Sequence, residues 1–259
     1  MSATVGVWLV LRGMSFFGDA FVHGVLPGIA AAVVFDFSPI LGAAVAAAVM
    51  VGAVEVIHRH TNLKEDTAIG LLFVGMMALG VVIISRSSSF TGSLTSILFG
   101  DALGVSWAGI QQQAVLAVVV IVGSLLLYRP LLVLSFSPVK AESLGMRPKL
   151  THALLLVLIA TAVIGSFQAV GTMLVFSLLV APPSAAALLS RSIPMMIALS
   201  AIIGAASVVI GLILSYYWGT AAAATMALVP IVFFLLVMEV QYLRRRRTKR
   251  PTAAAGVAA

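Results

Sequence analysis

Stretches of roughly 20 predominantly apolar residues recur along nearly the whole 259-residue chain, and they limit its fold more than any other feature does. Each stretch is long enough to cross the hydrocarbon core of a membrane, about 30 Å thick, as an α-helix. A helix also satisfies its backbone hydrogen bonds within one segment, as the interior of a bilayer requires. The composition agrees, since 62% of the residues are hydrophobic and 9% are charged. We therefore expect an all-α integral membrane protein.

Eight membrane spans are predicted from these stretches, and they leave no room for a separate soluble domain. Residues 1–11 are also apolar, but they would reach only about 16 Å as a helix. They lack the basic start and the small-residue cleavage site of a signal peptide, so we interpret them as the end of a truncated first span. The predicted domain is one transmembrane helical bundle over residues 1–243. Its eight spans are residues 15–35, 39–58, 66–85, 108–129, 150–167, 169–188, 196–217 and 221–243.

The basic residues predict the orientation of this bundle, because cytoplasmic loops collect Lys and Arg. With eight spans and a cytoplasmic C-terminus, Arg86 alone of the 15 basic residues falls outside. Residues 244–259 begin with RRRRTKR and are expected to form a disordered tail that contacts anionic membrane lipid. No nucleic-acid partner is expected, because the basic residues lie at helix ends and in this tail. The absence of Cys excludes a disulfide framework and a thiolate metal site.

An acid and an imidazole interrupt the first complete span, in the stretch GDAFVHGVLPG at residues 18–28. Asp19 and His23 are four residues apart, so on a helix they lie on one face, close enough to share a ligand. Ionisable groups within a membrane are costly and by default mark a pathway or a site. A carboxylate oxygen with an imidazole nitrogen suits zinc, manganese or ferrous iron. The alternative interpretation is a polar pair that joins two helices.

Two protein donors do not complete the coordination shell of such a metal, since zinc takes about four and manganese about six. The remaining donors would be water, backbone carbonyls or the same pair on a second subunit. Pro27 follows His23 by four residues and offers no N–H to the His23 carbonyl. We expect a kink there that leaves this carbonyl oxygen free.

Three further segments differ from ordinary spans. Residues 85–107 predict a short helix at or dipping into the outer surface, where Asp101 would guide cations to an entrance or cap a turn. Pro182 and Pro183, in APPSAAA, are expected to break a span near its cytoplasmic end, for gating or for packing alone. Residues 135–149 predict a cytoplasmic link with a short helix that ends near Gly145, and this link is a candidate docking element.

The sequence contains no phosphate-binding loop of the form G-x-x-x-x-G-K-[ST]. If ATP drives transport, another chain therefore supplies the hydrolysis.

Five blocks of the sequence resemble the metal-ion permease family of ABC importers, the membrane subunits of zinc, manganese and iron uptake systems. They occur in the order expected of that family, and the resemblance covers about residues 10–243, although family members usually have a longer N-terminal span. The blocks are RGMSFFGDAFVHGVLPG, EDTAIGLLFVGMMALGVVIIS, ILFGDALGVS, LSFSPVKAESLGM and VGTMLVFSLLVAPPSAA.

The resemblance implies a bundle similar to the vitamin B12-type (type II) importer permease, working as a homo- or heterodimer in a prokaryotic plasma (inner) membrane. Its implied partners are ABC ATPase subunits and an extracellular or periplasmic metal-binding protein. Asp19 and His23 match the family's acid and histidine on the translocation path. The stretch from Pro138 to Met146 matches the helix that couples to the ATPase. The implied coupling residues are Pro138, Lys140, Ala141, Glu142, Leu144, Gly145 and Met146.

The expected function is therefore that of a permease subunit, not itself an enzyme, that passes a divalent transition metal into the cytoplasm and holds no permanent cofactor. The segments EDTAIG and VLPG favour manganese over zinc, and iron stays open. One alternative is an ABC permease for a siderophore or cobalamin, which would not need the acid and histidine. The others are an ATP-independent intramembrane transporter, for which inverted repeats and more embedded acids would be expected, and an intramembrane enzyme.

Overall fold

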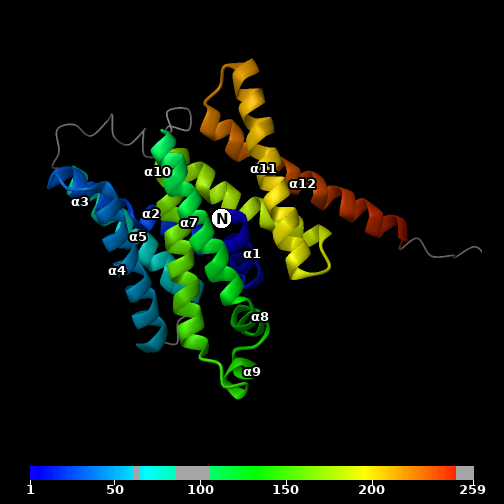
Figure 1. Ribbon diagram of the computed structural model, residues 1–259, viewed down its shortest axis with the longest axis horizontal. Coiled ribbons are helices and arrows are strands. Elements are labelled where there is room, and N and C mark those ends of the chain that lie inside the picture. Colours follow the sequence, from blue (N-terminus) through cyan, green and yellow to red (C-terminus); the bar gives the residue numbers. More distant parts are fainter. Residues whose placement is uncertain (61–64, 86–105, 249–259) are drawn as a thin grey trace, which may run out of the picture.

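Every regular element in the part of the chain that the structure describes is a helix (Figure 1). The structure is a computed structural model, and it describes residues 1–60, 65–85 and 106–248. The all-helical class predicted from the sequence is confirmed. The helices are α1 (Ser2–Leu11), α2 (Ser15–Gly24), α3 (Leu26–Val34), α4 (Pro39–His60), α5 (Glu65–Ile84), α7 (Trp107–Leu126), α8 (Tyr128–Phe136), α9 (Pro138–Ser143), α10 (Pro148–Leu189), α11 (Ile193–Trp218) and α12 (Ala222–Thr248).

Six helical segments among the described residues are long and apolar enough to cross a membrane. Two predicted spans, residues 66–85 and 169–188, contain shorter apolar helices at Thr67–Ile83 and Met173–Leu189. The count of eight spans therefore stays a prediction. Residues 86–105 of the predicted outer segment, with Asp101 among them, lie outside the described residues. The six long segments are Ser15–Val34, Pro39–Ile57, Trp107–Leu126, Pro148–Ser166, Ile193–Trp218 and Ala222–Arg244.

The break within α10 lies at Gly171, and the prediction that Pro182 and Pro183 break a span is wrong. Gly171 has φ 72° and ψ 167°, a conformation open essentially to glycine alone. The helix then continues through both prolines to Leu189. A proline removes one hydrogen bond from a helix, but close packing against neighbouring helices sustains the helix around it. Figure 1 shows that the two halves of α10 run in different directions.

The short helix α1 lies in the interior of the bundle, against α10 and α11. All residues from Thr4 to Leu9 are buried, and the indole of Trp8 meets the ring of Tyr128 edge to face at 5.6 Å. Gly6 makes this position possible, because a β-carbon there would lie 2.0 Å from the Leu179 carbonyl oxygen. The apolar sequence of α1 thus has neighbouring helices rather than lipid as its surroundings.

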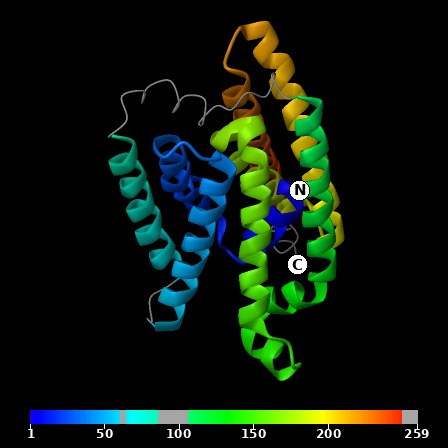
Figure 2. The same ribbon diagram turned by 60° about the vertical axis from the view of Figure 1, so that its left-hand side comes forward.

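Helices α2 and α3 pack against α4 and α5, which lie side by side at one edge of the bundle (Figure 2). Helices α11 and α12 pack against each other and against α10. A β-carbon on Gly211 would lie 2.5 Å from the Met226 Cα, so α11 and α12 approach each other closely. The α2–α5 group carries both polar residues of the first complete span.

Candidate functional site

Asp19 and His23 lie on one face of α2, as their spacing predicts. The carboxylate Oδ1 and the imidazole Nε2 are 3.6 Å apart. The two side chains are 29% and 28% exposed, respectively, while Phe17, Ala20 and Phe21 on the same helix are fully buried. The pair therefore occupies the one partly open face of an otherwise buried helix.

The distance between the two donors suits a shared metal ion. Two ligands bound at about 2.1 Å to one zinc or manganese lie roughly 3.0–3.5 Å apart, so a small side-chain rotation brings this pair into range. Among the described residues, no group of three or more His, Cys, Asp or Glu is placed to hold a metal. The pair by itself supplies two ligands and leaves positions for others.

The phenyl ring of Phe73, on α5, packs against the imidazole ring of His23. Its ring meets the His23 ring at a centroid distance of 5.8 Å and an angle of 70°. The same phenyl ring meets Phe16 at 5.8 Å and 72°, so it lies between two residues of α2. These edge-to-face contacts restrict the directions in which His23 can point. The sequence gives no signal for this neighbour, because Phe73 is one of many apolar residues on α5.

On the face of α2 and α3 that lies away from the pair, glycines allow close packing against neighbouring helices. A β-carbon on Gly18 would lie 2.8 Å from Leu179 Cδ2 and 3.1 Å from Leu9 Cδ2. A β-carbon on Gly24 would lie 2.2 Å from the Met50 sulfur, and one on Gly28 would lie 1.9 Å from the Gly42 carbonyl oxygen. At Gly28 the neighbour is a backbone atom, so the close approach of α3 and α4 requires glycine there, whereas at Gly18 and Gly24 a β-carbon would displace the ends of flexible side chains. The backbone that carries Asp19 and His23 thus packs closely against neighbouring helices on the face away from the pair.

Pro27 interrupts the helix, as predicted, so that α2 ends at Gly24 and α3 begins at Leu26 with the proline in its first turn. That the His23 carbonyl oxygen stays free remains a prediction. Across the junction, the Val25 N–H lies only two residues on from this carbonyl, too near along the chain for a well-aligned hydrogen bond. Val25 itself keeps a helical backbone, with φ −84° and ψ −11°.

The predicted cytoplasmic link forms the short helix α9, which Figures 1 and 2 both place at one end of the molecule. Gly145 ends it with φ 71°. The N–H groups of Gly145 and Met146 donate to the Glu142 and Ala141 carbonyls at 2.9 Å and 3.0 Å, which is the Schellman arrangement. The predicted helix and its glycine cap are confirmed. Ala141 is buried, whereas Val139 and Leu144 are 75% and 64% exposed.

The two prolines predicted as a gate pack between helices. A β-carbon on Gly204 of α11 would lie 3.7 Å from the Pro182 ring, and one on Gly6 would lie 2.8 Å from the Pro183 ring. Their described neighbours are therefore α1 and α11, while the open face of the Asp19–His23 pair meets α5.

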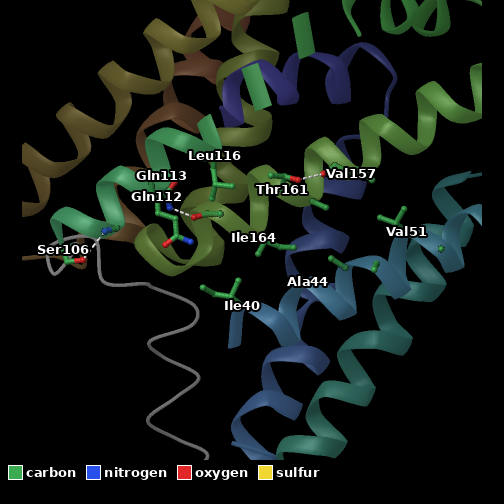
Figure 3. Close-up of a pocket in the computed structure, with 16 residues that line it drawn as sticks. Ile40, Ala44, Val51, Ser106, Gln112, Gln113, Leu116, Val157, Thr161 and Ile164 are labelled. Carbon is green, nitrogen blue, oxygen red and sulfur yellow. Dashed lines mark hydrogen bonds between the residues drawn. The ribbon is translucent and has the colours of Figure 1, made fainter. Parts of the chain in front are cut away.

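A cavity of about 780 Å³ lies between α4, α7 and α10, apart from the Asp19–His23 pair (Figure 3). Its polar lining is neutral, and part of it is already hydrogen-bonded. The Gln113 amide donates to the Gly165 carbonyl, and the Thr161 hydroxyl donates to the Val157 carbonyl at 2.9 Å. With no acid and no histidine among the described residues that line it, this cavity is a poor binding site for a divalent cation.

Comparisons with known proteins identify the relatives of this chain. A family model described as the ABC 3 transport family matches residues 1–241. The "Manganese import system permease protein ScaB" of Streptococcus parasanguinis is 38% identical over 204 residues, which cover 79% of this chain and 72% of that protein. The "Chelated iron transport system membrane protein YfeD" of Yersinia pestis is 34% identical over 201 residues, 78% of this chain and 67% of that protein.

A solved structure, "PsaBC from Streptococcus pneumoniae in complex with Fab", superposes on this chain with a TM-score of 0.81. The two sequences are 32% identical, and the match covers 95% of this chain and 90% of the other.

Proposed function

The chain belongs to the ABC 3 transport family, and on that premise we propose that it carries a divalent transition metal into the cell as the permease subunit of an ATP-driven importer. It is an integral membrane transport subunit and not an enzyme, since ATP is hydrolysed by a separate subunit in such systems. The observation that carries the proposal is the Asp19–His23 pair, 3.6 Å apart on the open face of a helix that glycine contacts hold from behind.

Manganese is the metal that we propose. The similarity to a manganese import permease supports it, and the carboxylate and imidazole donors suit manganese, zinc and ferrous iron alike. The similarity to an iron transport protein makes iron the first alternative.

The pair acts as a transient ligand set on the translocation path. Because the described residues place two donors together, the remaining ligands come from water or from the same pair of a second permease subunit across a dimer interface. An incomplete shell favours transport, since an ion that is bound too tightly does not leave. The metal arrives from an extracellular or periplasmic binding protein and departs to the cytoplasm.

The proposed arrangement in the membrane has eight spans, a vitamin B12-type topology and a cytoplasmic C-terminus. The length of α5 supports counting it as a span, since its 20 residues extend about 30 Å as a helix. A helical second half of α10, which begins after the Gly171 break, supports the count as well. The positions of the basic residues support the orientation.

The ATPase docks on α9. Val139 and Leu144 present apolar side chains to the surroundings, and Lys140 and Glu142 are exposed beside them. A second cavity of about 610 Å³ lies beside this helix and is lined by acidic and basic side chains, which are Glu55, Glu142, Arg147 and Lys149. Mixed charge with an apolar centre is typical of a protein docking surface.

Whole-cell accumulation of manganese, zinc and iron tests the proposed function. The strains compared carry the intact chain, a deletion, His23→Ala, Asp19→Asn, or Asp36→Asn as a matched control. Asp36 is an exposed acid with φ 55°, a conformation that asparagine adopts well, so this control removes a charge without straining the backbone.

We expect the deletion, His23→Ala and Asp19→Asn to lose accumulation of one metal, and Asp36→Asn to keep it. Unchanged metal contents in the deletion strain, with no redundant importer present, would contradict the metal assignment and redirect the search to siderophores or other organic substrates.

A further inference from the structure

Arg12 and His152 form a hydrogen bond between the ends of two helices that are 140 residues apart in the chain. The Arg12 Nη1 lies 2.5 Å from the His152 Nδ1. Arg12 is the residue on which α1 ends, and His152 lies in the second turn of α10. His152 is 7% exposed and Arg12 is half-buried.

The chemistry of the two groups fixes the direction of this bond. A guanidinium only donates, so the Nδ1 atom of His152 accepts and carries no proton of its own. Because arginine stays charged at every physiological pH, the imidazole meets a permanent cation on that side. A buried contact of this kind ties α1 and α10 together more specifically than apolar packing does.

On one side, His152 is joined to α9 through a short and well-ordered connection. The Schellman turn at Gly145 leads directly to Arg147, on which α10 begins. Thr151, beside His152, donates both its backbone N–H and its hydroxyl to the Arg147 carbonyl, at 3.0 Å and 3.2 Å. This short hydrogen-bonded connection leaves little freedom between α9 and His152, so a displacement of α9 also displaces His152.

On the other side, Arg12 is joined to the helix that carries Asp19. Gly13, with φ 69°, turns the chain, and the Met14 N–H returns to the Leu9 carbonyl at 3.0 Å. The Leu9 side chain then packs against Gly18, where a β-carbon would lie 3.1 Å from its Cδ2. Gly18 immediately precedes Asp19, so Leu9, near the end of α1, contacts α2 next to the residue that we propose lies on the metal path.

We propose that Arg12 and His152 are positioning residues that transmit the movement of α9, driven by the ATPase, to the helix that bears Asp19 and His23. This inference rests on the proposed function. The hydrogen bond lets α10 and α1 move together, so that each ATP cycle at α9 changes the access to the metal pair. Without it, the ATPase still docks and hydrolyses, but the movement reaches α2 incompletely.

The test uses the full permease, co-purified with its ATPase subunit, reconstituted in proteoliposomes and supplied with its metal-binding protein, with Mn²⁺ as the probe. ATP hydrolysed and Mn²⁺ transported are measured in the same sample, and their ratio is the readout. His152→Leu removes the acceptor, and His152→Asn keeps one at nearly the same place. We expect His152→Leu to lower the Mn²⁺ transported per ATP by about 2- to 30-fold, the range of coupling changes on such networks, and His152→Asn to restore most of it.

The double variant Arg12→Met with His152→Leu separates coupling from stability. It removes both members of this hydrogen bond, so neither is left without the other, and it is expected to assemble even where His152→Leu alone does not. It should remain uncoupled, with a lowered ratio of Mn²⁺ to ATP. A wild-type ratio in the double variant, or a parallel fall of both rates in the single one, would overturn the inference. Failure of the proposed function would show instead as no Mn²⁺ transport by the wild type.

Discussion

At Gly18 a β-carbon would meet the ends of the Leu179 and Leu9 side chains, and this residue immediately precedes Asp19, which we propose lies on the metal path. The closeness of Asp19 and His23 on one face of α2 could be predicted from the sequence, because charged groups in an apolar run and a spacing of four residues are local signals. Their surroundings could not be predicted. Phe73, Leu179 and Leu9 come from three other helices, and only the folded bundle brings them to α2.

Replacing Gly18 by Val should weaken both stability and transport. The new side chain meets Leu179 and Leu9, and overpacking of this kind costs about 1–3 kcal/mol, more than valine gains as a helix former over glycine. Thermal unfolding in detergent and Mn²⁺ uptake in cells measure the two effects. Gly75→Val on α5 is the control, since nothing lies within 4 Å of a β-carbon there. Equal losses in both variants would show that the contact at Gly18 has no special role.

At the scale of helices, apolar runs predicted where the chain is helical, and a proline and a glycine predicted the short helix α9 with its cap. The break in α10 was placed wrongly at Pro182 and Pro183. Local sequence favours a break at a proline pair, but packing against α1 and α11 supports the helix there. The actual break at Gly171 depends on how the two halves of α10 pack, which a lone glycine does not reveal.

The crossing of α3 and α4 offers a direct test of helix packing. A β-carbon on Gly28 would lie 1.9 Å from the Gly42 carbonyl oxygen, a backbone atom that cannot rotate away. Gly28→Ala should therefore push the two helices apart and lower the thermal unfolding temperature in detergent. Gly52→Ala, also on α4, meets nothing within 4 Å and should match or exceed the wild type, because alanine favours a helix by about 1 kcal/mol over glycine. Similar unfolding temperatures for the two variants would contradict this packing.

At the scale of the whole molecule, three parts connect along the chain. In the proposed mechanism the ATPase docks on α9 at one end of the molecule and α2 presents Asp19 and His23 to the metal, while Arg12 and His152 join α10 to α1. The sequence predicted α9 and the Asp19–His23 pair as separate motifs. The connection between them depends on a contact across 140 residues, and neither Arg12 nor His152 stands out as a motif in the sequence.

The most direct test of the proposed metal path is ATP-driven uptake of Mn²⁺ into proteoliposomes that contain this chain with its ATPase subunit and are supplied with the metal-binding protein. Asp19→Asn is compared with Asp36→Asn, and assembly is checked by the ATP hydrolysis of each complex. The account predicts that Asp19→Asn assembles and hydrolyses ATP but transports little or no Mn²⁺, while Asp36→Asn transports as the wild type does. Mn²⁺ uptake at the wild-type rate by the Asp19→Asn complex would contradict the assignment of the metal path to α2.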